Sequence, residues 1–175
     1  EDNFVAGRPE WEVAGVQMVE DVLPWEQMKL RMLNGSHSFL AYLGYLAGYA
    51  HINECMQDDS FREAAGRLML KEQAPTLRIT NVDLTAYADS LLDRFANPAL
   101  QHRTWQIAMD GSQKLPQRML EGIRMHLERN TAWPLLALGV AGWMRYVSGT
   151  DEQGNAIDVR DPLSDKFQAI VATSS

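Results

Sequence analysis

The sequence has little cysteine and a deficit of positive charge, and both shortages exclude classes of protein. Cys55 is the only cysteine among the 175 residues, so no internal disulfide can form. A single cysteine suits a reducing compartment, and it is read here as a small apolar core residue. Lys and Arg total 16 against 23 Asp and Glu, which gives a net charge of -7. A surface of this charge repels phosphate backbones, so we expect no nucleic-acid partner.

Long apolar runs are also missing. The most apolar stretches, Phe39 to Tyr49 and Trp133 to Val147, are shorter than the ~20 residues of a membrane-spanning helix, and the second contains Arg145. The first residues, Glu1-Asp2-Asn3-Phe4, show no signal peptide and no initiator Met. We therefore expect a cytoplasmic protein with no membrane partner, and a chain that is a piece of a longer one.

Apolar residues recur three and four positions apart along most of the chain, which predicts helices. No segment alternates apolar and polar residues over the length of a strand, and the composition is that of a globular protein. The expected helices cover residues 24–49, 61–74, 84–96, 99–109, 116–130 and 134–147, and Pro162 opens the last one. We expect one all-α domain over residues 1–175, with six to eight helices and with residues 1–20 as an interdomain lead-in.

Polar residues interrupt the apolar pattern between Lys29 and Ser38. At about 100° per residue, Ser36 lies about 20° from Lys29, His37 about 80° and Asn34 about 140°, so all four project from one half of the helix. Asn and Gly in a helix interior each cost up to roughly 1 kcal/mol relative to Ala, so packing or function must offset the loss. A lone histidine on such a face is more often a core residue with its hydrogen bonds formed. The four polar residues together are equally compatible with a functional site.

The spacing Lys-x-x-x-x-Asn-x-x-His, formed by Lys29, Asn34 and His37, resembles the signature of the polyol-specific long-chain dehydrogenases, the mannitol dehydrogenase family. The similarity covers nearly the whole chain and is greatest to the fructuronate reductase (D-mannonate oxidoreductase) branch. The stretches that carry it are Gly7-Arg8-Pro9, Phe39 to Tyr45, Asn97 to Leu100 and Asp110 to Pro116.

The resemblance implies a two-domain enzyme. Members of the family carry an N-terminal Rossmann domain that binds NAD and a C-terminal helical domain that supplies the catalytic lysine. This sequence has no Gly-x-Gly-x-x-Gly and no alternation of strands and helices, so we expect the helical domain alone. The cofactor NAD is then bound mainly by the absent domain, which is the expected partner, and the isolated chain is expected to be inactive.

Lys29, Asn34 and His37 are the expected catalytic residues. Reduction of a ketone by hydride needs a proton donor for the developing alkoxide, and alcohol oxidation needs the same group as a base. A lysine does both when burial in a closed interdomain cleft brings its pKa from ~10.4 toward about 7 to 8. Asn34 would donate its amide N–H to the same oxygen, and His37 would hydrogen-bond a neighbouring hydroxyl. Ser36 is expected to support these residues.

A sugar acid also brings a carboxylate, for which Lys114 and Arg103 are the expected substrate-binding cations. The mannitol-specific branch tends to carry a basic residue eight positions before the equivalent of Lys114, whereas Gln106 stands there in this sequence. Arg31 lies about 200° from Lys29 on the helical wheel, which points it away from the motif.

No metal is expected. His51, His102 and His126 form no pair at i, i+4 spacing, and the acidic turn at 151–155 lacks the alternating ligands of a calcium loop.

Three functions remain open after the sequence. The leading one is the catalytic helical domain of an NAD-dependent oxidoreductase that interconverts D-fructuronate and D-mannonate. The second is a polyol 2-dehydrogenase of the mannitol and fructose type, in which no cation pair recognises a carboxylate. The third is a helical interaction module that keeps the fold without catalysis.

Overall fold

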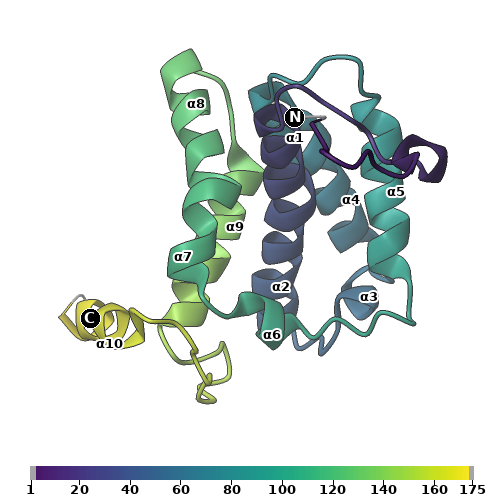
Figure 1. The fold of residues 1–175 in the computed structure, drawn as a ribbon. Coiled ribbons are helices and arrows are strands. Elements are labelled where there is room, and N and C mark those ends of the chain that lie inside the picture. Colours follow the sequence, from purple (N-terminus) through teal and green to yellow (C-terminus); the bar gives the residue numbers. More distant parts are fainter. Residues whose placement is uncertain (1–2, 174–175) are drawn as a thin grey trace.

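The computed structural model describes residues 3–173, and these residues form helices and no sheet. Two isolated antiparallel bridges, His51 with Arg103 and Thr150 with Ala156, are the β pairing found there. The expected all-α class is confirmed. Figure 1 shows one central helix with helices α7, α8 and α9 on one side and helices α3, α4 and α5 on the other.

The bounds of the elements follow in chain order, with η for 3₁₀ and π segments. They are η1 Trp11–Ala14, α1 Leu23–Met28, η2 Lys29–Gly35, α2 Ser36–Leu46, α3 Ile52–Cys55, α4 Asp59–Arg67, η3 Leu68–Gln73, η4 Ala74–Thr76, α5 Leu84–Ala96, α6 Thr104–Ala108, α7 Gly111–Leu115, η5 Pro116–Leu120, α8 Glu121–Arg129, α9 Pro134–Val147 and α10 Ser164–Thr173.

Several of these elements join end to end without a break. The described residues then form eight helical runs besides η1, which agrees with the expected six to eight: 23–46, 52–55, 59–76, 84–96, 104–108, 111–129, 134–147 and 164–173. Three of the runs contain a π-helical segment, η2, η3 or η5. A π segment closes its turn with i→i+5 hydrogen bonds, and such segments inside α-helices are rare and frequent at functional sites.

Capping residues place several helix ends where the sequence predicts them. The carboxylate of Asp58 accepts from Ser60 N at 2.8 Å, and that of Asp83 accepts from Ala86 N at 2.9 Å. Each carboxylate satisfies a backbone N–H that has no partner within the helix. Asn130 has the left-handed conformation (φ 52°) and ends α8 as expected.

The expected helix over 99–109 is wrong in its first half, because α6 begins only at Thr104. Gln101 has a positive φ of 41°, and Arg103 pairs with His51 in an antiparallel bridge. The backbone therefore satisfies its hydrogen bonds against the segment after α2 rather than within a helix.

Proline positions account for three smaller differences. The run expected to open at Pro116 begins at Gly111, and Pro116 lies inside it. A proline in a helix interior removes one N–H and crowds the preceding turn, and here the π segment η5 begins at that residue and widens the turn. Pro75 lies within the closing 3₁₀ turn η4, and α10 begins at Ser164, two residues after Pro162.

Helix α2 forms the centre of the domain (Figure 1). The consecutive residues 39–42 are all completely buried, so this helix is enclosed on every side. Helix α9 packs along it at close range, because a Cβ added at Gly142 would lie 2.7 Å from a methyl carbon of Leu43. The central helix is therefore held rigidly, and the polar segment before it is held with it.

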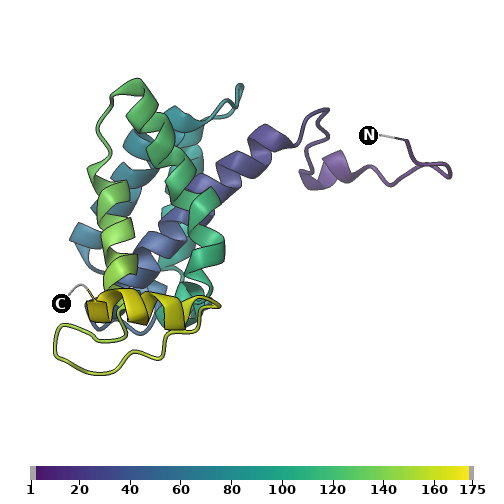
Figure 2. The same ribbon diagram turned by 90° about the vertical axis from the view of Figure 1, so that its left-hand side faces the viewer.

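Residues 3–22 extend away from the helical body (Figure 2). Apart from the single turn η1 they form no helix, and nearly all of their side chains are exposed. Glu1 and Asp2 of the expected lead-in lie outside the described residues. None of the helices within 3–173 is long and apolar enough to cross a membrane.

We predict that Gly35→Ala lowers the free energy of unfolding by about 1–3 kcal/mol. A Cβ at position 35 would lie 2.8 Å from the carbonyl oxygen of Arg118 and 2.9 Å from Nε2 of Gln73, so the contact between two helical runs must open.

Urea unfolding followed by circular dichroism measures the effect. Gly66→Ala is the matched control, because a Cβ there meets only a methyl carbon of Leu92 at 3.5 Å. In a helix interior the control is expected to stabilise the chain by about 0.4–1 kcal/mol. Equal stability of the two variants would contradict the close contact at Gly35.

Candidate active site

The polar motif lies in the π-helical segment η2, which begins at Lys29 and ends at Gly35. Because a π turn contains more residues than an α turn, residues five apart move toward the same face of the helix. Lys29 and Asn34 are five apart, so the π segment brings them closer in direction than the 140° of a regular helix. Ser36 is completely buried, whereas Lys29 is exposed, so the two residues lie in different surroundings.

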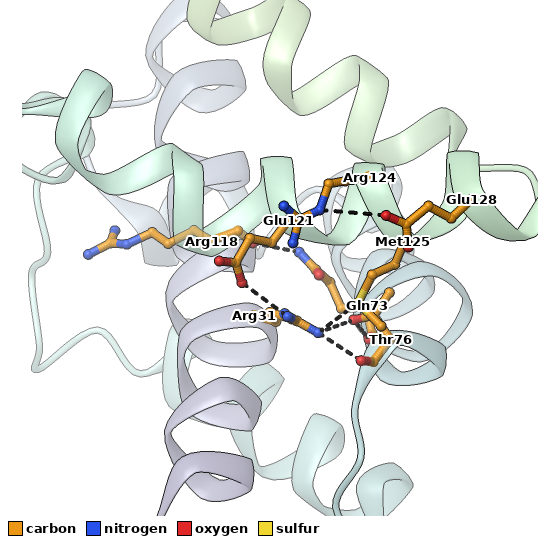
Figure 3. A network of polar contacts seen from close by, with 8 residues as sticks. All are labelled: Arg31, Gln73, Thr76, Arg118, Glu121, Arg124, Met125 and Glu128. Atoms are coloured by element: carbon orange, nitrogen blue, oxygen red, sulfur yellow. Dashed lines mark hydrogen bonds and ion pairs between the residues drawn. The ribbon is translucent and has the colours of Figure 1, made fainter.

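Gln73 fixes the end of this π segment. Its Nε2 donates to the carbonyl oxygen of Arg118 at 2.9 Å (Figure 3). Gly35 lies against both groups. The three residues belong to η3, η5 and η2, so one side chain connects the three π segments. Only glycine leaves room for this approach at position 35.

Arg31 stabilises the opposite side of the same segment. Its Nη1 donates to the carbonyl oxygen of Thr76 at 2.7 Å, and its Nη2 lies 3.2 Å from a carboxylate oxygen of Glu121 (Figure 3). Arg31 is only 4% exposed, so this pairing compensates a buried charge. The expectation that Arg31 points away from the motif agrees with this position.

A cavity of about 280 Å³ adjoins the motif on its other side. It lies between the end of η2, the start of α2, the segment leading into α6, and the run formed by α7 and η5. Its lining residues are Asn34, His37, His102, Arg103, Gln106, Ile107, Lys114 and Arg118. The cavity thus brings together four of the five expected site residues from three separate parts of the chain.

Lys29 is the expected residue that does not line this cavity. It is exposed and begins the π segment in which Asn34 is the sixth residue. The described residues therefore place the lysine outside the cavity and do not enclose it.

His37 is held by two aromatic neighbours. Its ring stacks on that of Phe95 with centroids 5.2 Å apart, and the ring of His102 lies tilted at 5.2 Å. Burial, assisted by the nearby positive charges of His102 and Arg118, lowers the pKa of His37 to about 3. The imidazole is therefore neutral at neutral pH, and its buried Nε2 has no hydrogen-bond partner within residues 3–173.

Lys114 is fixed by the loop that precedes it. Its ammonium donates to the carbonyl oxygen of Met109 at 2.6 Å, and a carboxylate oxygen of Asp110 lies 4.0 Å away. Burial, followed by the charge of Arg118, lowers the pKa of Lys114.

Arg103 directly precedes α6. Its backbone pairs with that of His51, and its side chain is exposed.

Three polar residues that line the cavity are not among the site residues expected from the sequence. The sequence indicates His102 only as a candidate metal ligand and Gln106 only as a departure from the mannitol branch, and it does not single out Arg118. Arg118 follows Lys114 by four residues on one helical run, a spacing that places both side chains on one face. That spacing was the local signal in the sequence for Arg118.

No cluster of three metal-binding side chains occurs in the part of the chain that the structure describes.

The charges of the cavity are unbalanced. All of its charged lining residues, Arg103, Lys114 and Arg118, are cations. Three of its side chains each have a buried polar atom without a partner in the described structure: Oδ1 of Asn34, Nε2 of His37 and Nε of Arg118. Buried polar groups are normally paired, so these atoms are free to hydrogen-bond polar groups of a ligand, and the three cations favour one that carries negative charge.

Relatives of this chain are oxidoreductases. Residues 21–175 match the family model of the mannitol dehydrogenase C-terminal domain. The whole chain is 79% identical to the uncharacterized oxidoreductase YeiQ of Escherichia coli K12, and 98% of it is 63% identical to the D-mannonate oxidoreductase of that organism. Mannitol dehydrogenase DSF1 of Saccharomyces cerevisiae is 44% identical over 97% of the chain.

The same fold occurs in a solved structure, the ternary complex of Pseudomonas fluorescens mannitol 2-dehydrogenase with NAD and D-mannitol. It matches 98% of this chain with a TM-score of 0.87 and 39% identity, and the match covers 35% of that protein. The chain spans 36% of the length of both E. coli relatives. The chain thus corresponds to about a third of the length of each of these relatives.

We predict that the His37 imidazole stays neutral down to about pH 4, whereas in the unfolded chain it titrates near its usual value of ~6.5. Between these pH values the unfolded chain binds a proton that the folded chain does not. The free energy of unfolding therefore falls as pH is lowered from about 6.5 toward about 3.

Nitrogen-15 NMR of the imidazole measures the ionisation directly. Urea unfolding at pH 7 and pH 5 measures the linked stability, and His37→Gln, which does not titrate, is the control that lacks this part of the pH dependence. A ring that takes up its proton near pH 6 would contradict the burial of His37.

Proposed function

The chain belongs to the mannitol dehydrogenase C-terminal domain family, and we propose that it is the substrate-binding and catalytic domain of an NAD-dependent oxidoreductase that interconverts D-fructuronate and D-mannonate. The observation that carries this proposal is the cavity beside the motif, in which three cations stand without a lining carboxylate. A sugar acid supplies the missing negative charge and a polyol does not. The 63% identity to a D-mannonate oxidoreductase supports the same substrate class.

The partner of this domain is a second domain of the same protein. The chain spans 36% of its E. coli relatives, so those proteins have room for the Rossmann domain that the family resemblance implies. Exposed apolar side chains gather directly before Lys29, where such a domain would bury them: Val13, Val16, Met18, Val19, Val22 and Leu23.

The residues that the structure describes do not form a complete binding site for NAD. The cavity holds about 280 Å³, and the chain has no glycine-rich turn between a strand and a helix to bind a pyrophosphate. The nucleotide is therefore assigned to the Rossmann domain, which would bring the hydride carrier to the open side of the site. The residues of this chain act on the substrate and on the proton.

Lys29 would transfer the proton. As the ketone is reduced, its ammonium would give a proton to the oxygen that becomes the alcohol, and in oxidation the amine would take that proton back. Lys29 is exposed in this chain, so a Rossmann domain packed over it would remove it from water. The site would become complete only when the two domains meet.

Asn34 and His37 would orient the substrate. The Asn34 amide can donate to the reacting oxygen and stabilise negative charge as it develops there. His37 is neutral at neutral pH, so its unpartnered Nε2 can exchange a hydrogen bond with a substrate hydroxyl without adding charge. Lys114 and Arg103 would attract the carboxylate at the far end of the substrate. No step assigned to these residues requires a metal ion.

A polyol 2-dehydrogenase is the second candidate. The match to the complex with NAD and D-mannitol and the 44% identity to mannitol dehydrogenase DSF1 favour it. The motif residues would act in the same way, and the cavity cations would then face hydroxyl groups.

We predict that the complete protein reduces D-fructuronate with a kcat/KM about 10²-fold or more above that for D-fructose, because only the uronate pairs its charge with the cavity cations. Steady-state assays with NADH measure both substrates. A preference for fructose would support the polyol 2-dehydrogenase, and turnover of neither would support a non-catalytic module.

We predict that Lys29→Ala lowers kcat and kcat/KM together by on the order of 10²-fold or more, because the proton is transferred in the transition state. The pH dependence of alcohol oxidation should disappear with it, and added primary amines should restore part of the rate.

Two further variants distinguish loss of the proton donor from loss of other contacts to the substrate. Asn34→Ala should lower kcat by about 10²-fold through loss of alkoxide stabilisation, and Lys114→Ala should mainly raise KM for the acid and keep the pH profile. A Lys29→Ala enzyme with unchanged kcat and pH profile would leave the motif a purely structural segment.

A further inference from the structure

We propose that Arg118 is the residue that distinguishes sugar acids from polyols, and that it binds the substrate carboxylate together with Lys114. This inference deepens the proposed function and rests on it. It assigns a specific role to a side chain that the motif does not include.

Hydrogen bonds fix both the backbone and the guanidinium of Arg118. Its carbonyl oxygen accepts from Gln73, and its Nη1 donates to Oγ of Ser38 at 3.0 Å. Ser38 is buried and directly follows His37 in the chain. Figure 3 shows the Arg118 side chain extending away from the Arg31 cluster. The guanidinium is thus already in place at the cavity, and little side-chain entropy is lost when a ligand binds.

The Arg118 guanidinium has at least one N–H donor without a partner in the described residues. Its Nε is buried and has no hydrogen-bond partner in the described residues. In a planar guanidinium Nε and Nη2 share one edge, and this edge matches the two oxygens of a carboxylate. Because Nη1 is occupied by Ser38, the edge with Nε is the one left for a bidentate ligand.

The surroundings of Arg118 favour a negative ligand. Lys114 precedes it by one turn, and burial, followed by the charge of Arg118, lowers the pKa of Lys114. The Asp110 carboxylate lies 4.0 Å from the Lys114 ammonium, and Asp110 does not line the cavity. A bound carboxylate would relieve the repulsion between the two cations and pair the free Nε at once.

Arg118 is better suited than Arg103 to set selectivity. Arg103 is exposed, so water and salt screen its charge, whereas Arg118 is half-buried. Loss of a buried charge-assisted pair affects affinity more than loss of an exposed one.

The test uses the complete protein and compares D-mannonate with D-mannitol, which differ by the carboxylate. In Arg118→Gln we expect kcat/KM for D-mannonate to fall by about 30- to 100-fold, chiefly through KM, while the value for D-mannitol changes less than about threefold. Where D-mannitol is not turned over, its inhibition constant serves as the readout. Arg124→Gln is the matched control, because Arg124 is exposed, pairs with Glu128 and does not line the cavity.

Arg118→Lys separates charge from geometry. It keeps the positive charge but loses the bidentate edge and the bond to Ser38, so we expect a loss of about tenfold for D-mannonate and none for D-mannitol. This variant decides the question if Arg118→Gln does not fold, as judged by its melting temperature.

Each result has one meaning. Equal losses for both substrates would show that Arg118 only supports the fold, and unchanged kinetics would remove it from the site; either result overturns this proposal alone. A wild-type protein that turns over neither substrate overturns the proposed function and this inference with it.

Discussion

The hydrogen bond from Gln73 to the carbonyl oxygen of Arg118 lies where the three π-helical segments of residues 3–173 meet. It requires a glycine at position 35, because any Cβ there would contact both groups within 3 Å. The polar motif belongs to one of these segments and Arg118 to another, so this contact and the hydrogen bond from Arg118 to Ser38 connect two walls of the cavity.

Some buried charges in this domain are paired within the fold, and others are not. Arg31 pairs with Glu121 and Thr76, and the Glu72 carboxylate accepts from the first free N–H groups of α9, Leu135 and Leu136. These buried charges are compensated within the fold. The cavity differs in its charged lining, which is entirely cationic. Buried polar atoms without a partner in the described structure occur in both places, for example Nε of Arg31 and Nε of Arg118, so the unbalanced charge is what distinguishes the cavity.

Local signals predicted much of the fold and part of the site. Apolar spacing identified the helices, Asp58, Asp83 and Asn130 marked helix ends, and the spacing of the motif led to the correct family. The π segments could not be predicted, since periodicity assumes a constant turn and a change at Lys29 shifts every later direction. The i, i+4 spacing after Lys114 was the only local signal for Arg118, because its hydrogen bond to Ser38 joins residues 80 positions apart and is formed by long-range packing.

The position of Lys29 connects the fold to the proposed chemistry. A lysine enclosed within this domain would carry its charge into the core at a cost in stability, whether or not substrate was present. On the exposed face of the π segment that cost is absent. In the proposed function, the lysine would leave water only when a second domain packs over it, so the proton donor would be activated at the interface. Such a division would place the chemistry under the control of domain closure, which would also exclude water from the reaction.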